Sequence, residues 1–385
     1  MPRLIFLFLI AFLVGADEFL LGPILTPIGA DLSVPPELIA LFITAYSLPL
    51  AIMAPILGGV SDRYGRLAVL VPSALVFGIA SIATSFVPTF ETGIATRILT
   101  GAASGGMLGI AMAMAGDLGD KAAPKAIAFV TSGLTLGIIL SPGIGALSTE
   151  FWSWRFAFAA LGGLALIVVL IGMPSLRSSS AHRSNADVGN AAGALFVPGA
   201  WGSLIAMAAG LGGAVGCFAL VGERLRSLYE WDTATVGMVY AGFGILTLVG
   251  NFTMPMALAR IGSGRALMRI ALVFVLAAIA VTYVFDSLAP ALVLLALTIW
   301  AVLGGIGAPG LQTHIAQLSP TRRGALMALA GSSMNLGVAG ATALASSVYP
   351  AGAAWVAGVA LVLIAIAIVA LRPVPTGAAE MASTG

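Results

Sequence analysis

The sequence has little charge, one cysteine and two histidines. Only 8% of its 385 residues are charged, whereas roughly a quarter are charged in a soluble domain, so a soluble fold is excluded. A lone cysteine, Cys217, excludes an internal disulfide. There is no Cys/His cluster, no G-x-x-x-x-G-K-[ST] phosphate loop and no G-x-S-x-G nucleophile. We therefore expect no metal ion, no cofactor and no enzymatic activity.

Apolar runs make up most of the chain. Hydrophobic residues account for 60% of it, and the mean hydropathy is +1.09. Divided at charges and at Pro/Gly clusters, the chain gives twelve apolar spans, each able to cross a layer of about 30 Å as a helix. These spans lie near residues 4–30, 36–58, 67–87, 92–115, 124–148, 154–174, 199–222, 233–258, 266–285, 288–312, 324–348 and 351–371. We predict an all-α membrane protein with twelve transmembrane helices.

One sizeable hydrophilic interval divides these spans into six and six. It runs from Ser175 to Gly193 and has the serine and glycine content of a flexible linker. A weak internal repeat, 120–137 against 319–337, supports the division. We predict an N-terminal six-helix bundle over 1–174, a linker over 175–198, a C-terminal six-helix bundle over 199–372 and a tail over 373–385.

Basic residues gather in alternate loops. If the N-terminus is cytoplasmic, thirteen Lys and Arg residues lie on that side, three lie on the other side, and Arg97 lies within a span. The positive-inside rule then predicts that both termini are cytoplasmic, in a bacterial inner or plasma membrane. Because these charges are spread over several loops, we expect no nucleic-acid partner.

The loop between the second and third spans carries glycines and charges at fixed positions. They are Gly58, Asp62, Arg63, Gly65 and Arg66. Gly58 allows neighbouring backbones to approach closely, and Gly65 permits a turn of positive φ. The two arginines can bind carboxylates or helix-end carbonyls, and Asp62 can face a helix N-terminus. A loop that only fixes orientation needs neither the aspartate nor the glycines.

This pattern resembles the signature of the major facilitator superfamily of secondary transporters, with Leu67 in place of its final basic residue. The resemblance implies two parallel bundles with a binding site between them near the bilayer midplane. It also implies that the loop controls the exchange of conformations. Asp117 matches an acid that pairs with Arg66 in relatives and would latch one conformation; a solvated loop acid is the alternative.

Three charged residues lie at least five positions from either end of a predicted span: Asp17, Glu18 and Arg97. An ionised carboxylate there costs about 2.5–3.5 kcal/mol, which marks function. Desolvation raises the pKa of a carboxyl group towards neutrality, as a proton carrier requires. Adjacent helical residues point about 100° apart, so we expect only one acid to face a central cavity. A structural pairing with a neighbouring helix is the alternative for the other.

The residues around these charges resemble motifs of the proton-antiporter branch, the drug-efflux and sugar-efflux permeases. In the first span the match is Ala16-Asp17-Glu18-Phe19, followed by Gly22 to Asp31-Leu32. The resemblance implies that Glu18 is the proton site, with Asp17 in reserve. Arg97 begins a match to a fourth-helix motif, with Thr100 in place of its glutamine. Its charge can favour proton release from a nearby acid; bonding to backbone carbonyls is the alternative.

The fifth span carries small residues in steps of four and a proline, which resembles the antiporter motif. The residues are Gly133, Gly137, Ser141, Pro142 and Gly145. Small residues form a groove for a facing helix, and a proline kinks its own helix. Generic packing explains the glycines equally well, and the position of the proline favours export.

We predict a monomeric transporter that exports a small, partly apolar compound in exchange for protons across the lipid bilayer. A proton-coupled importer and a receptor-like protein that transports nothing are the alternatives. Polar or aromatic residues near mid-span are expected to line the substrate cavity together with Arg97: Tyr46, Phe218, Tyr240, Trp300 and Asn335.

Overall fold

The computed structural model describes residues 3–119, 122–176 and 190–372, and within these ranges every regular element is a helix. Eleven helical segments are long and apolar enough to cross a membrane, and Ala354–Ala370 is a shorter apolar helix. Together they give the twelve spans that the sequence predicts. The all-α membrane architecture is therefore confirmed.

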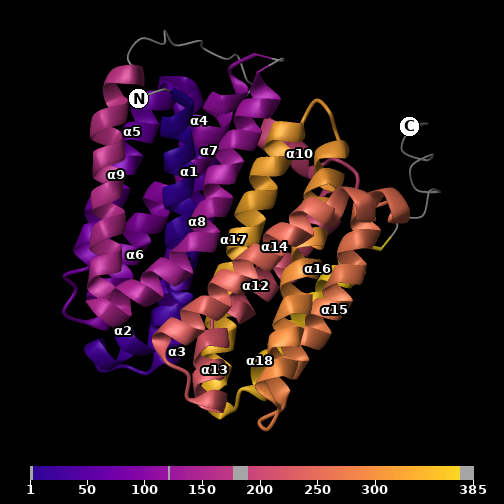
Figure 1. Ribbon diagram of the computed structural model, residues 1–385. Coiled ribbons are helices and arrows are strands. Elements are labelled where there is room, and N and C mark those ends of the chain that lie inside the picture. Colours follow the sequence, from indigo (N-terminus) through magenta and orange to yellow (C-terminus); the bar gives the residue numbers. More distant parts are fainter. Residues whose placement is uncertain (1–2, 120–121, 177–189, 373–385) are drawn as a thin grey trace.

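The helices form two halves that stand side by side (Figure 1). The first half contains α1 (Arg3–Phe19), η1 (Gly22–Ile24), α2 (Leu25–Leu32), α3 (Pro36–Ile39), α4 (Leu41–Tyr64), α5 (Arg66–Thr84), α6 (Phe90–Gly105), α7 (Leu108–Gly116), α8 (Ala123–Phe151) and α9 (Trp154–Leu176). The second contains α10 (Asn190–Leu195), α11 (Ala200–Ile205), η2 (Ala206–Gly212), α12 (Gly213–Phe218), α13 (Val221–Tyr229), α14 (Thr233–Ile261), α15 (Gly264–Val284), α16 (Pro290–Gln317), α17 (Arg323–Val348), η3 (Tyr349–Ala351) and α18 (Ala354–Ala370). We call the end of the molecule near residues 176 and 190 the linker end and the opposite end the far end.

Two spans change helix type along their length. In the first span, Pro23 lies in the short 3₁₀ turn η1, which separates α1 from α2. In the seventh, η2 is a π-helix between α11 and α12. Proline removes a backbone donor, and π-helical turns occur often at functional sites. Both irregular segments lie in helices that pack directly against α8, α14 or α17.

Glycines allow the closest helix contacts within each half. A Cβ atom on Gly133 or Gly137 of α8 would overlap the carbonyl oxygen of Phe8 or Phe12 on α1. In the second half, a Cβ on Gly337 of α17 would overlap the carbonyl oxygen of Ala208 in η2. These contacts place α1 against α8 and α17 against η2 with backbone touching backbone.

The halves meet mainly through two helix pairs, α4 with α17 and α8 with α14. Thr44 Oγ1 on α4 donates a hydrogen bond of 3.0 Å to the carbonyl oxygen of Ala339 on α17. On the other side, a Cβ on Gly237 of α14 would overlap the Cβ of Ala146 on α8. Any movement of one half against the other must therefore slide or open these two seams.

Candidate transport site

An ion pair is buried inside the first half. Arg97 Nη1 on α6 donates to Asp17 Oδ1 on α1 at 2.8 Å, and both side chains are fully buried. The guanidinium lies over the ring of Tyr46, 4.7 Å from its centroid, and 5.5 Å from that of Phe158. Aromatic faces attract a desolvated cation, so the rings add to the carboxylate in stabilising Arg97. Arg97 Nε and Nη2 and Asp17 Oδ2 have no hydrogen-bond partner among the described residues.

Glu18 is arranged differently from its neighbour. Its side chain is only partly buried, and it forms no ion pair with any described residue. Its Oε1 atom is buried without a hydrogen-bond partner there. Arg97, which the sequence places near Glu18, pairs with Asp17 instead, because the two acids point about 100° apart around α1. The structure thus separates the acids into one that is paired and one that is not.

The small residues of α8 contact α1 on one face and the second half on another. Gly145 lies against Leu20, about two turns beyond the contact of Gly137 with Phe12. Ser141 is on the same stripe; it is buried, and its Oγ has no described hydrogen-bond partner. The Pro142 carbonyl oxygen lies 3.5 Å from the Cβ position of Gly237 on α14. The stripe therefore connects the helix of the acids with the seam between the halves.

The signature loop is a tight turn between α4 and α5. Gly65 has φ +102°, a conformation that favours glycine, and its N–H donates to Ser61 O at 2.9 Å. Arg66 pairs with Asp62 one turn earlier and with Asp117 at the end of α7, where Nε lies 3.6 Å from Oδ2. Arg63 lies over the ring of Tyr64, 5.4 Å from its centroid.

Gly58 does not show the close backbone approach that the sequence predicts. A Cβ atom at this position would meet nothing within 4 Å. The neighbouring side chains of Ile56 and Val60 are exposed. The face of α4 that carries Gly58 is open at the linker end, although Ser61 on another face is buried there. The far end of α4, by contrast, is bonded to α17.

The expected cavity residues are almost completely buried in this conformation. Phe218 packs against Tyr240 and Trp300, with ring centroids 4.7 and 5.4 Å away. The Tyr240 hydroxyl donates to Phe218 O at 3.1 Å and accepts from Gly222 N at 3.1 Å. Tyr46 lies beneath Arg97, as described above. These aromatic groups act here as packing around the site.

Asn335 keeps a free acceptor on α17. Its amide Nδ2 donates to Gly331 O at 3.2 Å, whereas its buried Oδ1 has no partner among the described residues. The Oγ of Ser332, three residues earlier, is also buried without a hydrogen-bond partner in the described part of the chain. Both atoms lie on the helix that contacts α4 across the seam, so they can hydrogen-bond a guest there.

A group of residues that the sequence analysis missed joins the halves at the far end. Thr26 Oγ1 on α2 donates to Glu223 Oε2 on α13 at 2.7 Å. Arg226 donates to Thr26 Oγ1 at 2.9 Å and to Pro23 O at 2.6 Å. We call Thr26, Glu223 and Arg226 the far-end lock. The charged residues at 223–226, next to an apolar run, were the one feature of the sequence that could have indicated this contact. Their pattern is also that of ordinary loop residues.

These features define a class of protein, a polytopic helical protein of two halves. Within the described residues it has a buried ion pair, an acid without an ionic partner, and contacts between the halves at two seams and at the far end. Such a molecule is a secondary transporter. The chain belongs to the Major Facilitator Superfamily, whose family model matches residues 7–222. It is a multi-pass membrane transporter and not an enzyme.

Three comparisons illustrate this membership. The chain is 28% identical over 400 residues to the class G tetracycline resistance protein of Vibrio anguillarum, covering 94% of this chain and 96% of that protein. It is 33% identical over 147 residues to the bacillibactin exporter of Bacillus subtilis, covering 36% of each. The structure of a mutant of the nucleoside transporter NupG superposes with a TM-score of 0.72 at 16% identity, covering all of both chains, which shows the shared fold.

Proposed function

We propose that this transporter exports a small, partly apolar compound in exchange for protons by alternating access. The observation that carries the proposal is Glu18. It is an acid inside a membrane span, and one of its carboxylate oxygens is buried without a hydrogen-bond partner among the described residues. A charged group in that place is costly, and function is the usual reason for keeping it.

The buried ion pair beside Glu18 supports this role. Because Asp17 already neutralises Arg97, the Glu18 carboxyl group can gain and lose a proton without leaving an arginine unpaired. A structural acid would be paired in the same way as Asp17. In this proposal Glu18 carries the proton, and the Asp17–Arg97 pair fixes the α1–α6 geometry around it.

The contacts between the halves support alternating access with the far end closed. The far-end lock and the bond from Thr44 to Ala339 lie on the far side of the seams. At the linker end, Arg66 pairs within the first half, with Asp62 and Asp117. If both termini are cytoplasmic, as the basic loops predict, this conformation opens inward. The Arg66 cluster then acts as the conformational switch at that end.

Export is favoured over import by two relatives and by the α8 motif. One relative is named a tetracycline resistance protein and another an exporter. Pro142 lies where α8 meets α14, so a kink there changes the angle between the halves. The buried Oγ of Ser141 and Oδ1 of Asn335, which have no hydrogen-bond partner among the described residues, can offer directed hydrogen bonds to a partly apolar guest.

Transport into inverted membrane vesicles tests the proposal. Tetracycline is the first probe, followed by a panel of other small compounds. An exporter accumulates its probe when the vesicle lumen is acid and stops when a protonophore collapses the gradient. Accumulation that requires an acid exterior would instead identify an importer. A folded protein that moves no compound under either gradient would support the receptor-like alternative.

A further inference from the structure

Among the residues that the structure describes, the linker end of the second half carries positive charge without acids to balance it. Arg260 ends α14, and Arg265 and Arg269 lie on the first two turns of α15. From Thr233 to Arg372 the sequence contains one acid, Asp286, which lies at the far end and pairs with Arg224. None of the helices α14, α16 and α18, which pack against α15, contains Asp or Glu.

At the same end of the first half, a basic side chain is paired with acids. There Arg66 contacts both Asp62 and Asp117. By contrast, neither Arg265 nor Arg269 forms an ion pair with any described residue, and Arg269 Nε is buried with no hydrogen-bond partner there. His314 of α16 adds no negative charge, and its Cβ lies 3.3 Å from the Cβ position of Gly264. The N-terminus of α15 adds a positive partial charge.

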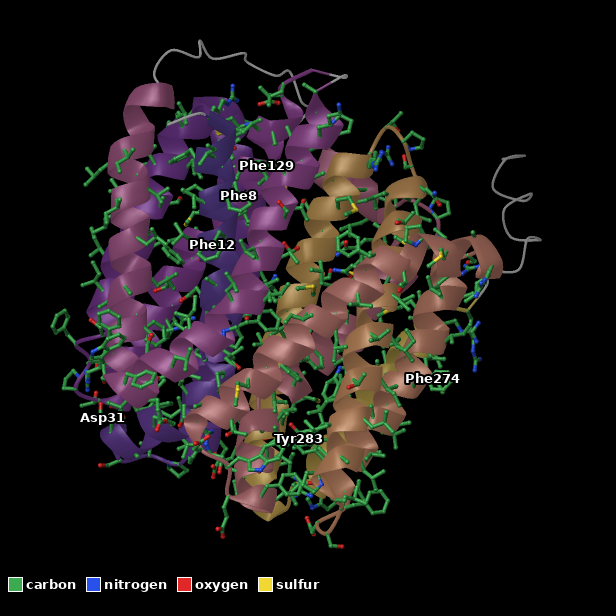
Figure 2. The ribbon with its side chains drawn as sticks, viewed as in Figure 1. Phe8, Phe12, Asp31, Phe129, Phe274 and Tyr283 are labelled. Carbon is green, nitrogen blue, oxygen red and sulfur yellow. The ribbon has the colours of Figure 1, made fainter. Side chains whose placement is uncertain are left out.

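Arg269 lies inside the membrane span rather than in the loop. It is four residues beyond Arg265, about 6 Å deeper along the helix axis. Its neighbours Ile270 and Val273 are 45% and 54% exposed, so apolar surface begins directly beside it. Figure 2 shows nitrogen-bearing side chains at the outer edge of the second half, on the linker side of Phe274. A small anion from water could pair with Arg269 but would gain nothing from the apolar surface beside it. An amphiphile matches both the charge of Arg269 and the apolar surface.

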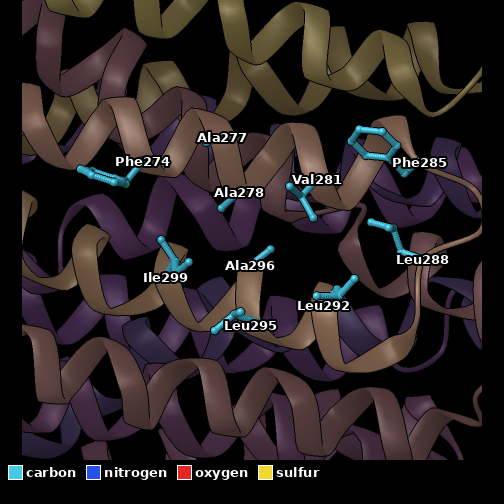
Figure 3. Close-up of a pocket in the computed structure, with 10 residues that line it drawn as sticks. All are labelled: Phe274, Ala277, Ala278, Val281, Phe285, Leu288, Leu292, Leu295, Ala296 and Ile299. Carbon is cyan, nitrogen blue, oxygen red and sulfur yellow. The ribbon is translucent and has the colours of Figure 1, made fainter.

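An apolar groove continues from this surface. It lies between α15 and α16, begins at Phe274 and has a volume of about 310 Å³ (Figure 3). All ten residues that line it are apolar: Phe274, Ala277, Ala278, Val281, Phe285, Leu288, Leu292, Leu295, Ala296 and Ile299. Phe274 is five residues beyond Arg269, about 7.5 Å along the axis. An acyl chain attached to a headgroup at Arg269 is long enough to span that distance and enter the groove.

We propose that Arg265 and Arg269 bind the phosphate of an anionic phospholipid, with one acyl chain passing along α15 into the groove. Guanidinium groups suit phosphate because they offer several donors in a planar fork. Basic pockets between transmembrane helices are known to recognise such headgroups. The site is separate from Glu18 and from the seams, so it does not depend on the proposed transport reaction.

Native mass spectrometry of the full chain tests this site with phosphatidylglycerol and, for comparison, zwitterionic phosphatidylcholine. We expect retention of phosphatidylglycerol and about fivefold weaker retention in Arg269→Gln, since one basic residue near a membrane surface contributes about 1 kcal/mol. Arg269→Lys keeps the charge and should retain most of the binding. Arg323→Gln is the matched control, because it removes one exposed arginine from the same end of the same half, on α17.

The groove is tested separately with Ala277→Trp, which fills it from an exposed position. We expect about tenfold weaker retention of both lipids, the loss when roughly two methylene groups leave the groove. Equal losses in Arg269→Gln and Arg323→Gln would reduce the effect to net charge and overturn the proposal. Unchanged lipid binding in Ala277→Trp would show that the acyl chain does not occupy the groove. Displacement of lipid by inorganic phosphate would identify a plain anion site instead.

Discussion

At the scale of single residues, the two acids of α1 divide two tasks between them. Asp17 is fully buried and bonded to Arg97, and Glu18 is partly buried and free of ionic partners among the described residues. Neighbouring positions on one helix thus have different environments because they face different directions. Their substitution should therefore have different consequences, which stability and proton movement can separate.

Glu18→Gln should abolish substrate-driven proton movement and leave the fold intact. The amide keeps the shape of the side chain but has no titrating proton, and no ion pair is lost. The measurement is quenching of a pH dye inside proteoliposomes when substrate is added, with thermal unfolding as the check on folding. If Glu18→Gln keeps full coupling of substrate to proton movement and Asp17→Asn loses it, Asp17 and not Glu18 carries the proton.

Asp17→Asn should destabilise the protein by about 3–5 kcal/mol, because it leaves Arg97 charged and unpaired in the interior. The double variant Asp17→Asn/Arg97→Gln removes both charges and should recover most of that loss. Urea or thermal unfolding in detergent, arranged as a double-mutant cycle, measures the coupling. Additive effects of the two substitutions would show that the pair contributes little, and the 2.8 Å contact would have no energetic role.

At the scale of helices, sequence predicts the elements better than their contacts. The twelve spans follow from hydropathy, and the Arg66–Asp117 contact follows from a family pattern. The partner of Arg97 could not be predicted in this way. The rotation of α1 about its axis is set by glycine contacts with α8, which hydropathy does not show. The far-end lock joins Thr26 to residues about 200 positions later, and no local pattern announces that contact. Gly58 has no packing partner because its face of α4 is open at the linker end of this structure.

The glycine stripe of α8 gives a prediction with a control on the same helix. A Cβ at Gly137 would overlap Phe12 O on α1, whereas a Cβ at Gly143 would meet only Ala241 Cβ at 3.7 Å. Gly137→Ala should therefore destabilise the protein by about 1–3 kcal/mol through overpacking. Gly143→Ala should be neutral or stabilising by up to about 1 kcal/mol, from helix propensity. Thermal unfolding of both variants in one detergent decides; equal effects would contradict the close α1–α8 contact.

At the scale of the whole molecule, the two ends of the seams are unequal. Thr44 and Ala339 hold α4 against α17 on the far side, and the far-end lock joins α2 to α13. The antiparallel register set by Thr44 and Ala339 brings Gly58, fourteen residues further along α4, level with Ala325 and beside Gly324. A Cβ on either glycine would meet nothing within 4 Å. Two open glycines at one level of two facing helices suit a contact that forms when the linker end closes.

Breaking the far-end lock should therefore bring Gly58 and Gly324 together. Arg226→Gln removes the bonds to Thr26 and Pro23, which favours the conformation that is open at the far end. The measurement uses the double variant Gly58→Cys/Gly324→Cys, whose remaining cysteine is the buried Cys217. A short bismaleimide should cross-link the two new cysteines slowly. Adding Arg226→Gln should raise the cross-linking rate about fivefold, as a shift of about 1 kcal/mol in the conformational equilibrium requires.

Arg155→Gln is the control for this experiment, because the far-end bonds of Arg155 to Asp31, Ser85 and Val87 stay within the first half. If both arginine variants change the rate equally, loosening of the far end in general explains the result. If neither does, the lock does not govern the exchange of conformations.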